Sequence, residues 1–214
     1  MKHGVACVIS LAVFAGCMGS EPVRFVSPSF YAQAPGQVAV LPFDNESTDL
    51  VGPEMLRGMV ATRLRGHGYA PVAVETVNEK LRAIGITDGG QLRAVASQKL
   101  RDALGVEGLF YGGVEDFAFL NVGFAIRRVV RLRMKFVRAS TGETLWEDTG
   151  EGITERFTFK KKEAERAYME GVIERAAELA FRTPLMPESL EAVRGLFLRL
   201  PVMTGTLPAL NYGL

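Results

Sequence analysis

Cysteine, histidine and tryptophan are scarce in this chain of 214 residues, which holds two Cys, two His and one Trp. A zinc or similar metal cluster built from His and Cys needs more of these ligands than the chain offers. A Ser-His-Asp or Cys-His nucleophile would depend on one of the two His. We therefore expect neither a cofactor nor hydrolase chemistry of these classes.

An excess of one sign of charge is also missing. There are 25 Lys and Arg against 24 Asp and Glu, which gives a formal net charge of +1. General nucleic-acid binders carry a basic surplus, so no nucleic-acid partner is expected. The hydrophobic share of 48% with 23% charged residues is typical of a globular protein with a packed core.

The chain begins with a segment that is apolar but short. Two basic residues near the start precede an uncharged run of eleven residues from Val5 to Ala15. A helix of that length does not cross a bilayer, and the pattern is typical of a secretory signal peptide. A plain signal peptide and a buried N-terminal helix both remain open as interpretations.

Small residues and a Cys follow this run. Ala15, Gly16 and Cys17 resemble the lipobox of bacterial lipoproteins, although Phe14 replaces the usual Leu. The resemblance implies that residues 1–16 are removed and that Cys17 carries diacylglycerol and an amide-linked acyl chain such as palmitate. Three chains hold a protein to a membrane almost permanently. By the sorting rules of lipoproteins in diderm bacteria, Met18 favours the periplasmic face of the outer membrane, with surface exposure left open.

The remaining chain divides into three parts. Residues 17–36 hold three Pro and no sustained periodicity, which predicts a lipidated tether. Residues 37–200 alternate between strand and helix patterns and predict a single α/β domain, and 201–214 predict an irregular tail. The expected fold is a mixed β-sheet packed by helices mainly on one face. Strands are expected at 38–43, 69–74, 106–117, 124–137 and 143–150, and helices at 53–65, 77–84, 162–182 and 187–200. Between 84 and 105, Asp88 followed by Gln91 resembles a capping box that opens a short helix, and Ser97 can cap another helix that ends before Gly105.

The strongest periodicity lies at 124–137. Apolar and basic residues alternate there, which predicts a long strand with one buried face. Ser140-Thr141-Gly142 suits a short hairpin loop, and its length places Phe136 opposite Trp146 and Lys135 opposite Glu147. The basic residues of the outward face are a candidate site for an anion or an acidic protein surface; the alternative is a solvated face neutralised by acidic residues of the partner strand. These residues are Arg127, Arg131, Arg133 and Lys135.

A polar loop follows the first strand, where open α/β sheets tend to bind ligands. Its carboxylates could hold a cation or act as acid and base, and the alternative is a polar turn before a helix. The candidate residues are Asp44, Asn45, Glu46 and Asp49. His67, between two Gly at a helix end, is assigned a structural role. Gly112-Gly113 predicts a bulge, a close backbone approach or an exposed strand edge.

Three segments carry a family resemblance. They are VAVLPFDNEST at 38–48, the stretch from GYAPVAV to VEDF at 68–117, and STGETLW at 140–146. Together with Cys17 they resemble a family of bacterial lipoproteins of unassigned activity, one of which is a meningococcal surface-antigen candidate. The resemblance implies a fold like the amino-terminal domain of TolB and CsgG-like lipoproteins. It also implies accessory roles in envelope transport or assembly, sometimes as homodimers, and it supplies no catalytic residue.

Three functional hypotheses follow. The first is a non-enzymatic, lipid-anchored protein that binds other envelope proteins through a sheet edge or the 124–137 face. The second is an enzyme acting on envelope glycan with paired carboxylates, Asp44 and Glu46 with Glu115 or Asp116. The third is a carrier of a small apolar ligand, which a sizeable cavity between sheet and helices would favour.

Overall fold

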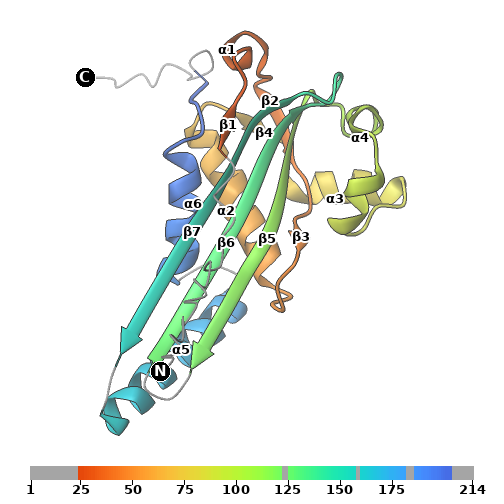
Figure 1. Ribbon diagram of the computed structural model, residues 1–214. Coiled ribbons are helices and arrows are strands. Elements are labelled where there is room, and N and C mark those ends of the chain that lie inside the picture. Colours follow the sequence, from red (N-terminus) through yellow and green to blue (C-terminus); the bar gives the residue numbers. More distant parts are fainter. Residues whose placement is uncertain (1–23, 122–124, 158–159, 182–185, 204–214) are drawn as a thin grey trace, which may run out of the picture.

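One mixed sheet of seven strands forms the centre of the molecule (Figure 1). The computed structural model describes residues 24–121, 125–157, 160–181 and 186–203. The strand order is β1-β7-β6-β5-β2-β4, with β3 paired to β5. The pairing is antiparallel from β1 to β5 and parallel among β5, β2, β3 and β4. This mixed sheet with its helices confirms the expected fold class. The strands are β1 (Phe25–Val26), β2 (Gln37–Val40), β3 (Asp44–Asn45), β4 (Ala70–Pro71), β5 (Gly108–Asn121), β6 (Ala125–Arg138) and β7 (Thr144–Phe157).

Helices cover the two faces of the sheet unequally. Helices α2 and α6 pack on one face, where they share the larger hydrophobic core with β5 and β6, and α5 lies on the same side further down the strands. Helices α3 and α4 and the 3-10 turn η1 cover the opposite face beside β2 and the start of β5. We call the uncovered part of that second face, over β5, β6 and β7, the open face; Figure 1 looks onto it. The helices are α1 (Phe30–Gln33), α2 (Gly52–Gly66), α3 (Val74–Ala83), η1 (Gly90–Ala94), α4 (Ser97–Leu104), α5 (Lys161–Phe181) and α6 (Pro187–Phe197).

The β6–β7 hairpin has the register expected from the sequence. Phe136 pairs with Trp146 and Lys135 with Glu147. Gly142, in the loop, has a φ of +74°, a conformation that Gly adopts without steric cost. The rings of Phe136 and Phe110 stack at 4.3 Å in the core. A shift by one residue would exchange core and solvent faces, so this hairpin fixes which side chains the open face presents.

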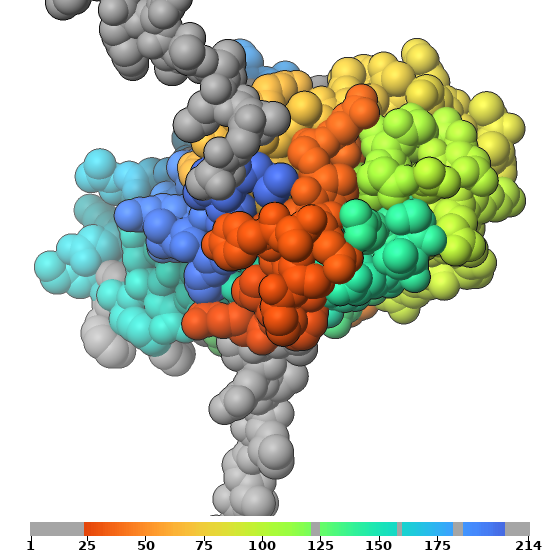
Figure 2. All heavy atoms as spheres, turned by 90° about the horizontal axis from the view of Figure 1, so that it is seen from above, coloured from red at the N-terminus to blue at the C-terminus, as the bar shows by residue number. Residues whose placement is uncertain are grey.

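Residues 24–36, the described part of the segment expected to be a tether, pack against the domain. Phe30 is fully buried against the ring of Phe136. The hydroxyls of Ser27 and Ser29 both donate to Oε1 of Glu143. Seen from above, β1 and α1 lie between α6 and the β6–β7 turn (Figure 2). A single buried aromatic and two short polar side chains give no periodicity, which is why the sequence predicted a tether here.

Two other expectations change in detail. The strand expected at 69–74 shortens to β4 because α3 begins at Val74. The bulge lies between Val114 and Asp116, and not at Gly112-Gly113. A Cβ at Gly112 would meet the ring of Phe43 at 2.3 Å, so the close-approach interpretation is confirmed for this glycine. Gly113 pairs with β3 on one side and β6 on the other, so it is no free edge.

The expected leader, Cys17 and most of the tail lie outside the described residues. Within the described ranges, no helix has the length and apolar character needed to span a bilayer.

Candidate functional site

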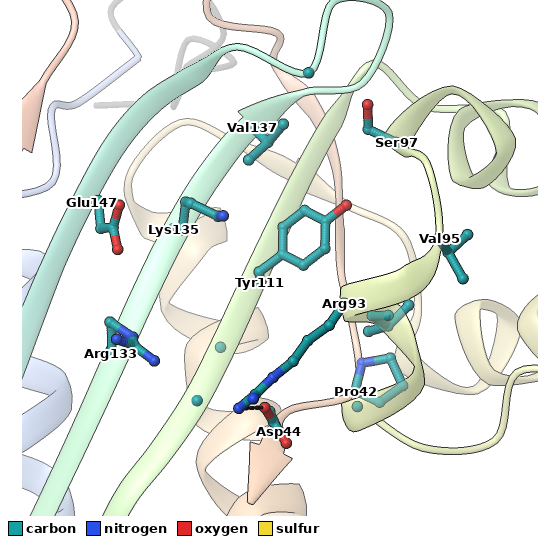
Figure 3. A pocket seen from close by; sticks show the side chains of 15 residues that line it. Pro42, Asp44, Arg93, Val95, Ser97, Tyr111, Arg133, Lys135, Val137 and Glu147 are labelled. Carbon is teal, nitrogen blue, oxygen red and sulfur yellow. Dashed lines mark ion pairs between the residues drawn. The ribbon is translucent and has the colours of Figure 1, made fainter.

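A cleft of about 480 Å³ lies on the open face between η1 and strands β5 and β6 (Figure 3). Gly112 and Gly113 form part of its lining. A side chain at Gly113 would point into the hollow, where the nearest atom to a Cβ is 3.9 Å away on Arg133, whereas a side chain at Gly112 would point to the other face of the sheet, toward Phe43. We call this hollow the open-face cleft. Its charged and phenolic lining consists of Asp44, Arg93, Tyr111, Arg133, Lys135 and Glu147.

The wall that carries Arg93 is held by local capping. Oε1 of Gln91 accepts hydrogen bonds from the backbone N–H groups of Thr87 and Asp88. Oδ1 of Asp88 accepts from the N–H of Gly90. Gln91 makes the bond back to the Asp88 N–H that the predicted capping box requires, but Asp88 accepts from Gly90 and not from Gln91, and the element that follows is a 3-10 turn. Gly89 touches the backbone of Phe43, so η1 sits directly on the chain that leads into β3.

Arg93 brings two acidic residues of the polar loop together. It forms ion pairs with Asp44 and, at 2.9 Å, with Oε1 of Glu46. The hydrogen bond and charge of Asp44, and then those of Glu46, raise the pKa of the Arg93 guanidinium above its usual value. The two carboxylates therefore share one cation, an arrangement that differs from the opposed pair of a glycosidase.

The upper end of the basic row forms the other wall. Arg133 contacts Glu115 at 3.4 Å and Glu46 at 3.9 Å. The ammonium of Lys135 lies 5.5 Å from the centroid of the Tyr111 ring, a cation–π contact. Burial raises the pKa of the Tyr111 hydroxyl above its usual value, so the phenol stays neutral near pH 7 and can donate a hydrogen bond. The cleft thus offers charges of both signs and a phenolic donor.

The lower end of the basic row is matched by acidic residues across the hairpin. Arg127 pairs with Glu155 at 3.1 Å and Arg131 with Glu151 at 2.5 Å. The hydrogen bond to Glu151 is the main cause that raises the pKa of Arg131 above its usual value. These pairs reduce the positive potential of the lower strand. Of the four basic residues predicted as one face, the structure places only Arg133 and Lys135 in the cleft.

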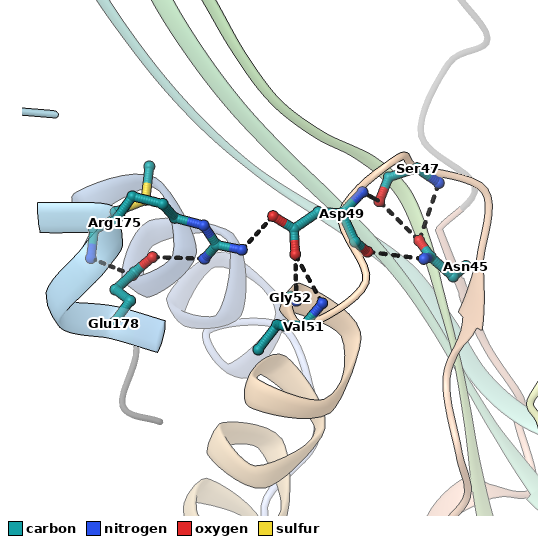
Figure 4. A network of polar contacts seen from close by, with 8 residues as sticks. Asn45, Ser47, Asp49, Val51, Gly52, Arg175 and Glu178 are labelled. Atoms are coloured by element: carbon teal, nitrogen blue, oxygen red, sulfur yellow. Dashed lines mark hydrogen bonds and ion pairs between the residues drawn. The ribbon is translucent and has the colours of Figure 1, made fainter. Parts of the chain in front are cut away.

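The polar loop has a second, structural half (Figure 4). Asn45 accepts from the N–H and hydroxyl of Ser47 and donates to the carbonyl of Asp49. Oδ1 of Asp49 accepts from the N–H groups of Val51 and Gly52, while its other oxygen pairs with Arg175 of α5. Asn45 therefore holds the shape of the loop, and Asp49 joins the start of α2 to α5. In the described part of the chain, no group of three or more His, Cys, Asp and Glu side chains has the geometry of a metal site.

His67 has the structural role expected for it. Its Nε2 lies 2.9 Å from the carbonyl oxygen of Phe197, and its ring meets the Phe197 ring edge-on at 4.7 Å. The side chain thus joins the end of α2 to the end of α6.

An apolar groove of about 430 Å³ lies beside α5, close to Phe117 and Val130. It is separate from the open-face cleft and lies on the other face of the sheet, where α5 packs. A groove of this kind is what the ligand-carrier hypothesis needs, and that hypothesis stays a prediction.

Two residues of the cleft escaped the sequence analysis. Arg93 lies in a short turn without periodicity, and Tyr111 lies in a strand among apolar residues. The Asp88–Gln91 capping signal located the turn, but nothing in the sequence showed that this turn faces β5 and β6. Their place in the cleft follows from the tertiary fold alone.

Similarity to known proteins extends over most of the folded domain. A family model described as "Putative lipoprotein GNA1162-like" matches residues 27–178, well over half of the chain. A curated relative from Neisseria meningitidis serogroup B, "Putative lipoprotein NMB1124/NMB1162", is 25% identical over 143 residues. That match covers 67% of this chain and 65% of the relative, so the chain spans about two thirds of the relative's length.

Among solved structures, lipoprotein GNA1162 from Neisseria meningitidis matches with a TM-score of 0.52 and 22% identity, covering 67% of this chain and 99% of that one. The PelC dodecamer from Paraburkholderia phytofirmans gives a TM-score of 0.42 at 14% identity, over 65% and 85% of the chains. LpoB from Escherichia coli gives 0.44 at 13%, over 72% and 84%. The last two scores are too low to define the fold. The family match implies a membrane-anchored protein of the cell envelope, and we conclude that the chain belongs to the GNA1162-like family of lipoproteins.

Proposed function

We propose that the protein is a non-enzymatic accessory component of envelope transport or assembly that binds another envelope protein in the open-face cleft. The observation that carries this proposal is the mixed lining of the cleft, where Arg93 and Lys135 stand with Asp44 and Glu147 around one hollow. A polypeptide segment with charged side chains and backbone amides complements both signs at once. A polyanion would meet the carboxylates of the lining.

The same proposal includes a lipid anchor at Cys17. Cys17 carries the acyl chains after residues 1–16 are removed, and the tether leads to the folded domain. The protein is then held on the periplasmic face of the outer membrane, where partner and anchored domain share one surface. A fixed anchor raises the effective concentration of the domain for neighbours on that membrane. A homodimer would be a further consequence of a shared surface and is an outcome to look for in the same experiment.

The test is site-specific photocrosslinking in intact cells, with the crosslinker in place of Lys135. Discrete crosslinks to envelope proteins are expected. Arg93→Glu, tested in the same crosslinker background, should remove them because it reverses the charge beside Asp44. Arg63→Glu is the matched control: it makes the same charge change on an exposed position of α2, which packs against the other face of the sheet.

The outcomes separate the functional hypotheses. Loss of the crosslinks in Arg93→Glu but not in Arg63→Glu supports the cleft as the docking site. Crosslinks that survive Arg93→Glu unchanged overturn the cleft proposal. A purified sample that turns over a glycan, and loses this activity in Asp44→Asn or Glu46→Gln, replaces it with the enzymatic hypothesis.

A further inference from the structure

Helix α5 packs on the sheet with its polar side. The carboxylate of Glu178 is fully buried, accepting from the N–H of Met186 and from Arg175. Glu174 pairs with the buried Arg128 of β6 at 2.5 Å. Gly171 lies against the ring of Phe119. The residues that face the body thus recur at three and four positions along the helix, but they are charged residues and glycine instead of apolar ones.

The outward side of α5 is apolar. Ile173 is 62% exposed and Met169 is 53% exposed. From Tyr168 to Ala180, residues with apolar side chains cover this side for more than three turns, and Glu170, Glu174 and Glu178 lie on the inward side. The charged first turns of α5, which include Glu165, are not part of it. We call this surface the α5 apolar face. It consists of Tyr168, Met169, Val172, Ile173, Ala176, Leu179 and Ala180.

An ordinary surface helix has the opposite arrangement, with apolar residues against the core and charges in water. A continuous exposed apolar surface marks an interaction site in a stable protein. The apolar groove of about 430 Å³ borders this face at Tyr168, Val172 and Leu179 and extends the apolar surface toward the sheet.

We infer that the α5 apolar face docks on the lipid bilayer that holds the anchor, with the helix lying in the headgroup–acyl boundary. This inference rests on the proposed acylation of Cys17. A helix with an apolar face and a charged opposite face is the form that binds membranes in the interface plane. Arg166, 82% exposed in its side chain, lies at the border of the face, where its long stem can reach the headgroups.

The path of the N-terminal segment supports a bilayer as the occupant. Strand β1 is antiparallel to β7, with Phe25 opposite Glu147 and Val26 opposite Trp146, so Arg24 is the described residue of this segment that lies furthest along β7 toward Phe157. Arg24 lies beside Asp148, at 3.9 Å. Cys17 lies seven positions before Arg24, a stretch of chain that spans about 25 Å at most. The lipids are therefore held close to the folded domain.

The position of α5 falls within that reach. Its residue Glu174 contacts Arg128, which pairs with Thr154 of β7. From Asp148 to Thr154 the strand advances about 20 Å. The anchor can therefore lie level with α5, and so short a connection keeps this end of the domain at the bilayer. The open-face cleft lies on the opposite face of the sheet and stays accessible to a protein partner.

The test uses the mature lipidated protein in vesicles of phosphatidylethanolamine and phosphatidylglycerol. Cleavage removes Cys7 and acylation blocks Cys17, so an introduced Cys is the only free thiol. A nitroxide is attached to Ile173→Cys and, as the matched control, to Arg82→Cys, an exposed position on α3. Accessibility to oxygen and to a water-soluble nickel chelate is then measured, together with flotation of the vesicles.

We expect the label at 173 to be at least about tenfold less accessible to the nickel chelate than the label at 82. The label at 173 should also be more accessible to oxygen than to the nickel chelate. A second variant combines Ile173→Asp with a nitroxide attached to Met169→Cys. In this variant the label should become accessible to the nickel chelate, while the protein still floats with the vesicles. The expected contact persists in neutral phosphatidylcholine vesicles, because apolar burial and not charge drives it.

Flotation separates the two proposals. A floating protein whose label at 173 is as accessible to nickel as the control overturns the docking inference and leaves the anchor intact. A protein that neither floats nor shields the label overturns both. Shielding with spin–spin broadening between copies, and without oxygen preference, shows that a second copy covers the face and overturns the bilayer as occupant.

Discussion

Helices α5 and α6 lie on the same side of the sheet and use opposite faces to contact it. Helix α6 turns Ala192, Val193 and Leu196 inward, where all three are fully buried. Helix α5 turns its charged residues inward and its apolar residues outward. Apolar residues recur at helical spacing in α6 and, from Tyr168 to Ala180, in α5. The difference shows that such spacing defines a helix face without determining whether that face packs inward or outward.

The residues of the sheet beneath each helix determine which face of that helix packs inward. Under α6, Gly150 and Gly152 of β7 leave a bare strand, and apolar side chains of the helix fill the space beside it. Under α5, the inward-facing parity of β6 includes Arg128, which is buried and needs anionic partners. Glu174 and Glu188 provide them, at 2.5 and 2.9 Å. A helix that supplies such a partner must turn its charged side to the sheet.

The sharpest way to test this contrast is to remove one aliphatic side chain from each helix. Leu196→Ala opens a cavity in the core and is expected to cost about 3 kcal/mol of unfolding free energy. Ile173→Ala, on an exposed position, should change it by less than about 0.5 kcal/mol. Urea unfolding followed by circular dichroism measures both. Similar losses in the two variants would mean that α5 buries its apolar face after all.

A second test adds a methyl group under α6. A Cβ at Gly150 would lie 2.0 Å from the carbonyl oxygen of Ala192, and backbone cannot move aside as a side chain can. Gly150→Ala should therefore cost about 2 kcal/mol. The control is Gly113→Ala, where the nearest atom is 3.9 Å away, on the flexible Arg133 side chain. If the control loses as much stability as Gly150→Ala, the close contact of α6 with β7 is not the cause.

The end of α6 gives a pH-dependent test. The buried Tyr69 donates its hydroxyl to the carbonyl of Pro201, just after α6. Burial raises the pKa of Tyr69 above its usual value of 10.0. The folded state thus favours the protonated phenol, and this stability is complete below pH 10 and is lost as pH rises toward the folded pKa, by up to about 1.4 kcal/mol per pH unit.

Comparison of urea midpoints at pH 9 and 11 measures this loss. Tyr69→Phe should show a smaller fall than the unchanged protein, while Tyr111→Phe, whose phenol has a pKa raised by burial alone, controls for the other shifted tyrosine. An identical fall in Tyr69→Phe and in the unchanged protein would exclude Tyr69 as the titrating group.

The smallest effect is expected for the ion pair under α5. Glu174→Gln removes the charge facing Arg128, but Glu188 still contacts that guanidinium, and Glu174 is half-exposed. The cost should be below about 1 kcal/mol and confined to α5. Amide hydrogen exchange should become a few times faster in α5 and stay constant in α6. The same selective loosening is expected in high salt, and equal changes in both helices would contradict local attachment by charges.

Local patterns in the sequence predicted the strands of the hairpin, its register and the capping of η1. These features depend on neighbours within a few residues, such as Gly142 in the loop or Gln91 after Asp88. The partners of the predicted site residues could not be predicted. Arg93 reaches Asp44 across 49 positions of sequence, and Asp49 reaches Arg175 across 126. Such contacts depend on helix placement, which periodicity leaves open.

Gly150 and Gly152 of β7 also affect how α6 is positioned in related proteins. Because a Cβ at Gly150 or Gly152 would collide with the carbonyl oxygen of Ala192 or Glu188, the close approach of α6 to β7 depends on the absence of side chains at these two positions. Exchanges among aliphatic residues elsewhere can therefore leave that close approach unaltered. Relatives that keep both glycines should superpose closely at this helix even where few other residues agree.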